Sequence, residues 1–248
     1  MKIYIGIFNQ EPIIKERGYY NLQLGATNNK NVISDIRDNV GSNISEKNGN
    51  YCELTGLYWI WKNETADIVG LTHYRRFFYK HSVIFNKKKV LSEKNIQTTL
   101  NKYDIIVPQE GHLFKSTVYK QYEESHDIED LRECGNVIKE IHPEYYGSFE
   151  KVVNSNHYYP YNMFICKKEI FDKYCEWLFS ILEVLEQRID VDKKDKYNKR
   201  VYGFLGERLF NIWLINNNLK VKDYPVYNVE QSMLKQQVIS IIKNIMFW

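Results

Sequence analysis

The chain has 248 residues, which is long enough for one large α/β domain with a substantial core. Its 34 Lys and Arg nearly balance 31 Asp and Glu, and the formal charge of +3 argues against a protein that binds nucleic acid mainly through the phosphate backbone. No apolar run predicts a signal peptide or a transmembrane helix, and the 4 cysteines have no metal-ligand spacing, so we expect a cytoplasmic protein with reduced thiols.

The first apolar run, residues 1–8, predicts a strand whose end, Phe8-Asn9-Gln10, lies where the binding cleft of an α/β fold usually begins. Residues 27–50 are rich in Asn, Asp, Ser and Gly and predict a long loop, of the kind that is often functional. Residues 50–63 then predict one helix, because apolar residues recur at helical spacing at Leu54, Leu57, Tyr58 and Trp61.

The next stretch, residues 67–78, predicts a binding site. A β-branched apolar run indicates a buried strand that ends abruptly in His73, Tyr74, Arg75 and Arg76. Ligands of open α/β sheets bind beyond the carboxyl ends of strands, so we predict that His73, Arg75 and Arg76 bind a phosphate or diphosphate. The alternative is a charged strand end whose arginines make ordinary surface ion pairs.

Strands and helices alternate along the rest of the chain, which predicts a mostly parallel sheet flanked by helices. We expect helices at 92–101, within 116–141 on either side of His126, at 168–188 and at 202–214, strands at 103–108, 161–166 and 221–227, and an aromatic loop at 143–160. One domain then covers residues 1–228. The remaining segment, 229–248, contains an amphipathic basic helix at 232–248 that packs on the domain or on a second subunit, or lies on a membrane surface.

Five segments carry a family resemblance: residues 43–48, 51–63, 70–78 (Gly70-Leu71-Thr72-His73-Tyr74-Arg75-Arg76-Phe77-Phe78), 162–165 and 203–209. In this order they resemble the small glycosyltransferases of bacterial capsule and O-antigen clusters that were long filed under a domain of unknown function. Five ordered motifs are more specific than any one of them. The likeness extends from the first strand to about Tyr227.

The resemblance implies a Rossmann-type variant of the GT-A fold. It also implies transfer of a sugar, galactofuranose or galactose, from a UDP donor to a growing capsular or O-antigen glycan, with inversion. A lipid-linked acceptor would place the protein at the inner face of the bacterial plasma membrane, with the C-terminal helix as a peripheral contact. The donor nucleoside is expected at Phe8, Asn9 and Gln10, where relatives usually carry His-Lys. The residues expected near the donor sugar or the acceptor are Tyr74, His126, Asn162 and Arg208.

The departing diphosphate carries negative charge, which a metal or fixed cations must stabilise. The string Asp190-Val191-Asp192 matches the usual metal motif of GT-A enzymes, but it follows a long predicted helix within a Lys-rich loop. Arg75 and Arg76 stand where that motif would be expected, and guanidinium groups bind diphosphate oxygens bidentately. We therefore expect a metal-independent enzyme, with Mn²⁺ or Mg²⁺ held by Asp190 and Asp192 as the alternative.

Glu207 is the predicted catalytic base, because the acceptor hydroxyl must lose its proton as it attacks the anomeric carbon. It lies inside an apolar helical pattern, where Gly203 and Gly206 would permit close approach of the substrate. The alternative is a structural carboxylate that pairs with Arg208 or with an arginine of the strand end. For the whole protein, a retaining transferase and a non-catalytic glycan-binding protein remain alternative functions.

Overall fold

A computed structural model describes residues 1–8, 16–81 and 88–228 of the chain. Asn9 and Gln10 of the predicted nucleoside site lie outside the described residues, as does the predicted C-terminal segment 229–248. In the described part, no helix combines the length and the apolar character needed to cross a bilayer.

The elements are as follows. The strands are β1 Lys2–Ile7, β2 Tyr19–Gln23, β3 Ile68–His73, β4 Arg76–His81, β5 Lys88–Val90, β6 Ile105–Pro108, β7 Gly111–His112, β8 His157–Tyr158, β9 Phe164–Lys167, β10 Val221–Tyr224 and β11 Val226–Asn228. The α-helices are α1 Asn48–Tyr51, α2 Leu54–Asn63, α3 Glu93–Leu100, α4 Val118–Ser125, α5 Ile128–Ile141, α6 Tyr146–Asn154, α7 Lys168–Arg188 and α8 Val201–Asn216. The 3₁₀ helices are η1 Ala26–Asn28, η2 Ser45–Lys47, η3 Pro143–Tyr145, η4 Val191–Lys193 and η5 Asn198–Arg200.

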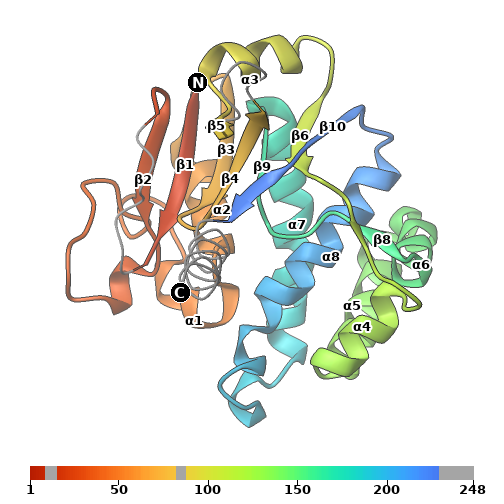
Figure 1. The fold of residues 1–248 in the computed structure, drawn as a ribbon. Helices are drawn as coiled ribbons and strands as arrows, with labels where there is room; N and C mark the ends of the chain where they lie inside the picture. Colours follow the sequence, from red (N-terminus) through yellow and green to blue (C-terminus); the bar gives the residue numbers. More distant parts are fainter. Residues whose placement is uncertain (9–15, 82–87, 229–248) are drawn as a thin grey trace, which may run out of the picture.

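The main sheet has the strand order β10-β6-β9-β3-β1-β2 (Figure 1). Neighbours β2, β1 and β3 are parallel, as are β6 and β10, whereas β9 runs antiparallel to both β3 and β6. The prediction of a mostly parallel sheet is confirmed for this strand order, in which β9 is the exception, while β4, β5 and β11 join the sheet through antiparallel pairs. Because β9 runs against β3, its first residue Phe164 pairs with Leu71 near the end of β3. Residues 161–163 therefore reach the sheet edge at which β3 ends.

The predicted strand end at His73 is confirmed, and the chain turns back there. His73 pairs with Arg76, the first residue of β4, so that Tyr74 and Arg75 form the turn between two antiparallel strands. β4 pairs in turn with β5 and β11. The cationic segment is thus the tip of the β3–β4 hairpin, and β4 is itself paired with β5 and β11.

Helices cover both faces of the main sheet. On one face, Leu71, Ile105 and Phe164 pack in a single cluster with residues of α2, α7 and α8. On the other face, Ile106 and Ile165 pack with residues of α3. Neighbouring residues of β6 and β9 thus point to opposite faces, as the period of a strand requires. The apolar runs of these strands are therefore explained by burial on both sides.

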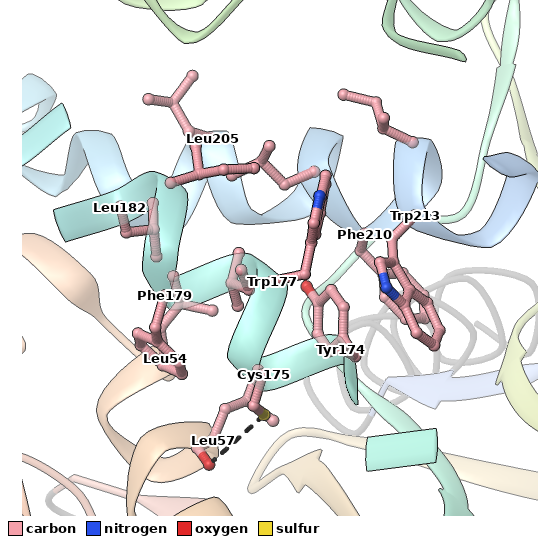
Figure 2. Packing of buried hydrophobic residues seen from close by; sticks show 14 of the residues in the cluster. Leu54, Leu57, Tyr174, Cys175, Trp177, Phe179, Leu182, Leu205, Phe210 and Trp213 are labelled. Carbon is pink, nitrogen blue, oxygen red and sulfur yellow. Dashed lines mark hydrogen bonds between the residues drawn. The ribbon is translucent and has the colours of Figure 1, made fainter. Parts of the chain in front are cut away.

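The long helix α7 lies between α2 and α8. Figure 2 shows Leu54 and Leu57 of α2 on one side of α7, and Leu205, Phe210 and Trp213 of α8 on the other. The helix predicted at 168–188 is confirmed, and residues along it from Phe171 to Leu185 are buried in the core. Helices α4, α5 and α6 gather at the side of the molecule away from β1 and β2 (Figure 1).

Two predictions of secondary structure were wrong. The helix expected over 50–63 breaks at Cys52, which has a φ of 53°, because Asn48 Nδ2 donates a hydrogen bond to Cys52 O at 2.8 Å and turns the chain. The aromatic loop expected over 143–160 contains α6, whose buried face includes Phe149 and Val152. The Tyr-rich composition of that segment obscured a short amphipathic period.

The polar loop at 27–50 is organised around one buried carboxylate. Asp38 is 0% exposed and accepts hydrogen bonds from Gly25 N, Ala26 N and Thr55 Oγ1 at 2.9, 3.0 and 2.7 Å. Ser45 Oγ also donates to Asp38 at 2.5 Å. The loop is thereby fastened to the start of α2. Its polar composition provides internal hydrogen bonds, which is a structural role.

Candidate active site

A cavity of about 310 Å³ opens at the sheet edge where β3 ends and β9 begins. Its charged lining comes from three different regions of the fold: the β3–β4 hairpin, the break between α1 and α2, and the segment from η5 into α8. The cavity is lined by His73, Arg75, Arg76 and Arg200, by the carboxylates of Glu53 and Glu207, by the rings of Tyr161, Tyr197 and Phe204, and by Asn162. The structure thus brings together five of the predicted site residues, namely His73, Arg75, Arg76, Asn162 and Glu207.

Arg76 presents an unneutralised guanidinium group to this cavity. Its Cζ lies 4.2 Å from the centre of the Tyr161 ring, which supports the side chain through a cation–π contact. Within the described residues, Arg76 makes no ion pair, and its Nε is buried without a hydrogen-bond partner. A guanidinium that is partly buried without a carboxylate loses hydration that the negative charge of a ligand would replace. This geometry is what an anion site requires.

His73 is neutral in this setting. Burial, together with the charges of Arg76, Arg75 and Arg200, lowers the pKa of His73 to about 3. The amide N–H of Arg75 donates to His73 Nδ1 at 3.4 Å, so the ring proton belongs on Nε2. His73 therefore offers a neutral N–H donor, and the positive charge of the hairpin belongs to its arginines.

Aromatic rings gather beside the hairpin tip, at the ends of β1 and β3. The ring of Tyr74 stacks on His73 with a centroid distance of 4.6 Å, and the guanidinium carbon of Arg75 lies 4.7 Å from the Tyr74 ring. Phe8 lies 6.4 Å from His73 and 6.3 Å from Tyr74 between ring centroids. Phe8, a predicted nucleoside-site residue, therefore lies beside the hairpin tip. Tyr74 contacts His73 and Arg75 but does not line the cavity.

The Glu207 carboxylate lies on α8, and 25% of its side chain is exposed. Burial raises the pKa of Glu207; the charge of Arg208 opposes the shift, and that of Glu53 adds to it. Arg208 Nη1 lies 3.2 Å from Glu207 Oε2, so the predicted alternative of a structural pair has a geometric basis. Glu207 lines the cavity and Arg208 does not, so Arg208 contacts the carboxylate from the protein side.

Glu53 is a second carboxylate of the site, and the sequence analysis missed it. Its Oε1 accepts a hydrogen bond from Asn162 Nδ2 at 2.9 Å. Asn162 Nδ2 also donates to Gly203 O at 3.0 Å, which ties the start of β9 to α8. Glu53 was assigned to a continuous helix, and only the break at Cys52 turns it toward the cavity. No local signal in the sequence marks that break.

Arg200 was also missed, because it stands in a run of lysines and charged residues that is typical of a solvated loop. Its Nε donates to Cys52 Sγ at 3.2 Å, and its guanidinium carbon lies 5.3 Å from the centre of the Phe204 ring. These contacts hold the side chain against the cavity, where it adds a third guanidinium group. The described lining residues thus include three guanidinium groups and two carboxylates, and His73 is neutral.

The two glycines of α8 serve helix packing. A Cβ on Gly203 would lie 3.0 Å from Cys52 Sγ, and a Cβ on Gly206 would lie 2.9 Å from Leu54 Cδ1. Both positions face α1 and α2, so the glycines allow α8 to approach the broken helix closely. The expectation that they make room for substrate was wrong, because their open side is already filled by protein.

Two other predicted site residues lie behind the cavity wall. Arg208 is 4% exposed and donates to Phe204 O at 3.0 Å and to Gln121 Oε1 at 2.5 Å, which joins α8 to α4. His126 follows α4, and its ring stacks on Phe204 at 4.0 Å. Neither residue lines the cavity. Each of them contacts a residue that lines the cavity: Arg208 contacts Phe204 and Glu207, and His126 contacts Phe204.

The Asp190-Val191-Asp192 string forms the turn of η4, away from this cavity. Asp190 Oδ1 accepts a hydrogen bond from Asp192 N at 3.2 Å, and Asp190 pairs with Lys193 at 2.9 Å. Asp192 lies 3.7 Å from Lys199. Across residues 1–8, 16–81 and 88–228, no group of three or more His, Cys, Asp and Glu side chains has the geometry of a metal site. The string therefore does not fit a metal at the cavity.

Comparisons with known proteins agree with this architecture. A protein family described as "Domain of unknown function (DUF4422)" matches residues 2–218. A solved structure described as the apo structure of the WbbM bifunctional glycosyltransferase is 33% identical, with a TM-score of 0.84, over 92% of this chain and 45% of that one. The chain thus spans less than half the length of that protein. No curated protein matches. The mixed α/β architecture matches a GT-A-like glycosyltransferase fold, as the resemblance implied.

Proposed function

The chain belongs to the DUF4422 family, and we propose that it is a glycosyltransferase that moves a sugar from a nucleotide-sugar donor to a glycan acceptor. The likeness to a bifunctional glycosyltransferase supports this assignment, since it extends over nearly the whole of this chain. Because less than half of that protein is matched, the proposal is for one transferase activity. The ordered sequence motifs favour UDP-galactofuranose or UDP-galactose as the donor and a capsular or O-antigen glycan as the acceptor.

The observation that carries the proposal is a guanidinium without a carboxylate partner beside a partly buried glutamate in one cavity. The guanidinium is that of Arg76, and the glutamate is Glu207. Cleavage of a sugar–diphosphate bond leaves negative charge on the diphosphate, and fixed cations stabilise that charge in the transition state. Guanidinium groups bind such oxygens bidentately. The neutral His73 adds a hydrogen bond donor beside them.

We assign Glu207 as the base of a single inverting displacement. The acceptor hydroxyl oxygen attacks the anomeric carbon and forms the new glycosidic bond, while the bond to the diphosphate breaks and its electron pair leaves with the nucleotide. The hydroxyl proton goes to Glu207. Burial raises the pKa of this carboxylate, which makes it a better proton acceptor than an exposed glutamate.

We propose that donor binding needs no metal. The cavity residues Arg75, Arg76 and Arg200 already supply positive charge where the diphosphate would lie. The Asp190-Val191-Asp192 string, in contrast, is part of a turn whose carboxylates contact lysines. The residues present therefore fit fixed cations better than a metal centre.

The test measures nucleotide release from a panel of UDP-sugars, with and without EDTA, for the wild type and Arg76→Ala. We expect release that survives EDTA, and a loss of UDP affinity of at least tenfold in Arg76→Ala, because a charge-assisted hydrogen bond contributes about 1.5–3 kcal/mol. Arg188→Ala is the matched control, since Arg188 pairs with Glu133 and Glu140 on the surface, away from the cavity.

Unchanged UDP affinity in both Arg76→Ala and Arg75→Ala would refute the diphosphate site. Complete loss of activity in EDTA that Mn²⁺ restores would refute metal independence and return attention to Asp190 and Asp192. Binding of glycan without nucleotide release from any donor would point to the non-catalytic alternative.

A further inference from the structure

Three rings in mutual contact form an aromatic cluster beside the cavity, which we name the aromatic shelf: Tyr197, Phe204 and His126. The ring centroids of Phe204 and His126 are 4.0 Å apart, those of His126 and Tyr197 are 5.6 Å apart, and those of Tyr197 and Phe204 are 5.1 Å apart. Tyr197 and Phe204 line the cavity, and Tyr197 remains 51% exposed. The shelf thus presents an open ring at the cavity.

The supporting contacts hold the shelf in place. The guanidinium of Arg200 lies against Phe204, and that of Arg208 donates to the Phe204 backbone at 3.0 Å. His126 lies behind these rings, and burial together with the charge of Arg208 lowers its pKa to about 4. The ring of His126 is therefore neutral near pH 7, so the shelf has no charge of its own. Such a surface suits an uncharged ring rather than a diphosphate.

We propose that the aromatic shelf binds a sugar ring of the acceptor glycan. The C–H face of a sugar packs on the face of an aromatic ring, and its hydroxyl groups remain at the edge to reach polar side chains. The proposal rests on the transferase function proposed above. The aromatic shelf is then the part of the site that selects the acceptor.

The position of the shelf on α8 connects it to the chemistry. Phe204 and Glu207 are three residues apart on one helix, so they are neighbours on the same face, and both line the cavity. One turn of an α-helix rises about 5.4 Å, which is comparable to the width of a sugar ring. A sugar stacked on the shelf therefore brings a hydroxyl to the carboxylate that takes its proton.

The donor is expected at the other wall. The arginines of the hairpin lie at the turn between β3 and β4, whereas the base and the two shelf rings that line the cavity, Tyr197 and Phe204, lie on α8 and the segment before it. An inverting displacement needs the acceptor and the departing diphosphate on opposite sides of the anomeric carbon. The hairpin arginines, Arg75 and Arg76, lie on one element and the rings with the carboxylate on another, which provides that separation. The third guanidinium group of the cavity, Arg200, lies on the same segment as the shelf, against Phe204.

The experiment measures transfer from the active UDP-sugar to octyl glycosides of galactose, glucose, N-acetylglucosamine and mannose. The variants are Tyr197→Ala, which removes the exposed ring, and Tyr197→Phe, which retains it. We expect Tyr197→Ala to raise the acceptor KM by roughly tenfold or more, because the stacked ring is lost, and to leave UDP affinity within about twofold. Tyr197→Phe should keep an acceptor KM close to that of the wild type.

Phe114→Ala is the matched control, because Phe114 is an aromatic residue that is 86% exposed and does not line the cavity. Melting curves check that each variant folds. An unchanged acceptor KM in a folded Tyr197→Ala would overturn the shelf while leaving the transferase function intact, as would weakened UDP affinity with a normal acceptor KM. A wild-type protein that transfers to none of the four probes would overturn both the function and the shelf.

Discussion

The cavity lining contains two carboxylates, Glu207 and Glu53, and each has a different hydrogen-bond partner. Glu53 is held by Asn162, whose Oδ1 is buried and has no hydrogen-bond partner among the described residues. Glu207 is held at one oxygen by Arg208. Of the two, Glu207 lies on the same helix face as the aromatic shelf. A base must contact the acceptor hydroxyl, so position favours Glu207 over Glu53.

Glu207→Gln should lower turnover by roughly 10²-fold or more while UDP affinity stays near that of the wild type, because the amide keeps the shape of the side chain but cannot accept the proton. Burial raises the pKa of Glu207, so the wild-type rate should fall on acidification at a pH above the ordinary range of a glutamate. Steady-state rates across pH and the anomeric configuration of the product, measured by NMR, check this prediction.

Glu53→Gln is the comparison for this prediction. It removes a carboxylate from the same cavity, and we expect a smaller loss of turnover than in Glu207→Gln. Near-normal turnover in a folded Glu207→Gln protein, with a large loss in Glu53→Gln, would transfer the assignment to Glu53. A product that keeps the configuration of the donor would contradict the inverting mechanism.

At the scale of the element, α8 carries the proposed base, one of the three shelf rings and the contact surface for the broken helix. Gly206 faces Leu54 of α2 and Asn162 before β9. Any side chain at this position would push α8 away from both. The same shift would move Glu207, the next residue. Packing of this helix and geometry of the site are therefore coupled.

Gly206→Ala should destabilise the protein by about 1–3 kcal/mol, because the added Cβ would lie 2.9 Å from Leu54 Cδ1 and 3.2 Å from Asn162 Oδ1. Urea unfolding measures the change. Gly147→Ala on α6 is the control, since a Cβ there would meet nothing within 4 Å and alanine is the better helix former. Equal free energies of unfolding for Gly206→Ala and Gly147→Ala would show that α8 can shift without a loss of stability.

At the scale of the whole molecule, one buried carboxylate joins the first strand to the connection before β3. Glu64 is 7% exposed; it accepts a hydrogen bond from Tyr4 OH and pairs with Lys2 Nζ at 3.0 Å. It also accepts from the amides of Thr65 and Ala66 at 2.8 and 2.9 Å. Burial acts to raise the pKa of Glu64, but these hydrogen bonds outweigh it and lower the pKa to about 2.

Glu64→Gln should therefore destabilise the protein most at neutral pH. The unfolded carboxyl titrates near 4.5 and the folded one near 2, so its contribution is complete above the first value and is lost as the pH falls through the second. We expect a difference in unfolding free energy of roughly 3 kcal/mol at pH 7 that shrinks toward pH 2. Urea unfolding at several pH values measures it.

The control for this effect is Glu124→Gln, because Glu124 is exposed on α4. It should show no comparable difference at any pH. A difference for Glu64→Gln that stays constant from pH 7 to pH 2 would mean that the charge of Glu64 does not stabilise the fold.

The sequence by itself determined the elements whose signals are local. The strand ending at His73, the long helix α7 and the capped helix α3 each carry their period or their cap within one segment, so residue spacing predicted them. The cationic strand end and Glu207, which both line the cavity, were predicted as candidates for the same reason, because residue type and immediate context marked them. The mostly parallel sheet followed from the alternation of elements.

The tertiary structure decided what depends on contacts far apart in the chain. The break at Cys52, which turns Glu53 into the cavity, depends on a side chain of Asn48 and on packing against Gly203. The antiparallel insertion of β9, which brings Asn162 to the end of β3, depends on strand pairing that no segment encodes alone. Residue spacing reports the neighbours of a residue along the chain, whereas the cavity is built from residues that become neighbours only through the packing of the folded core.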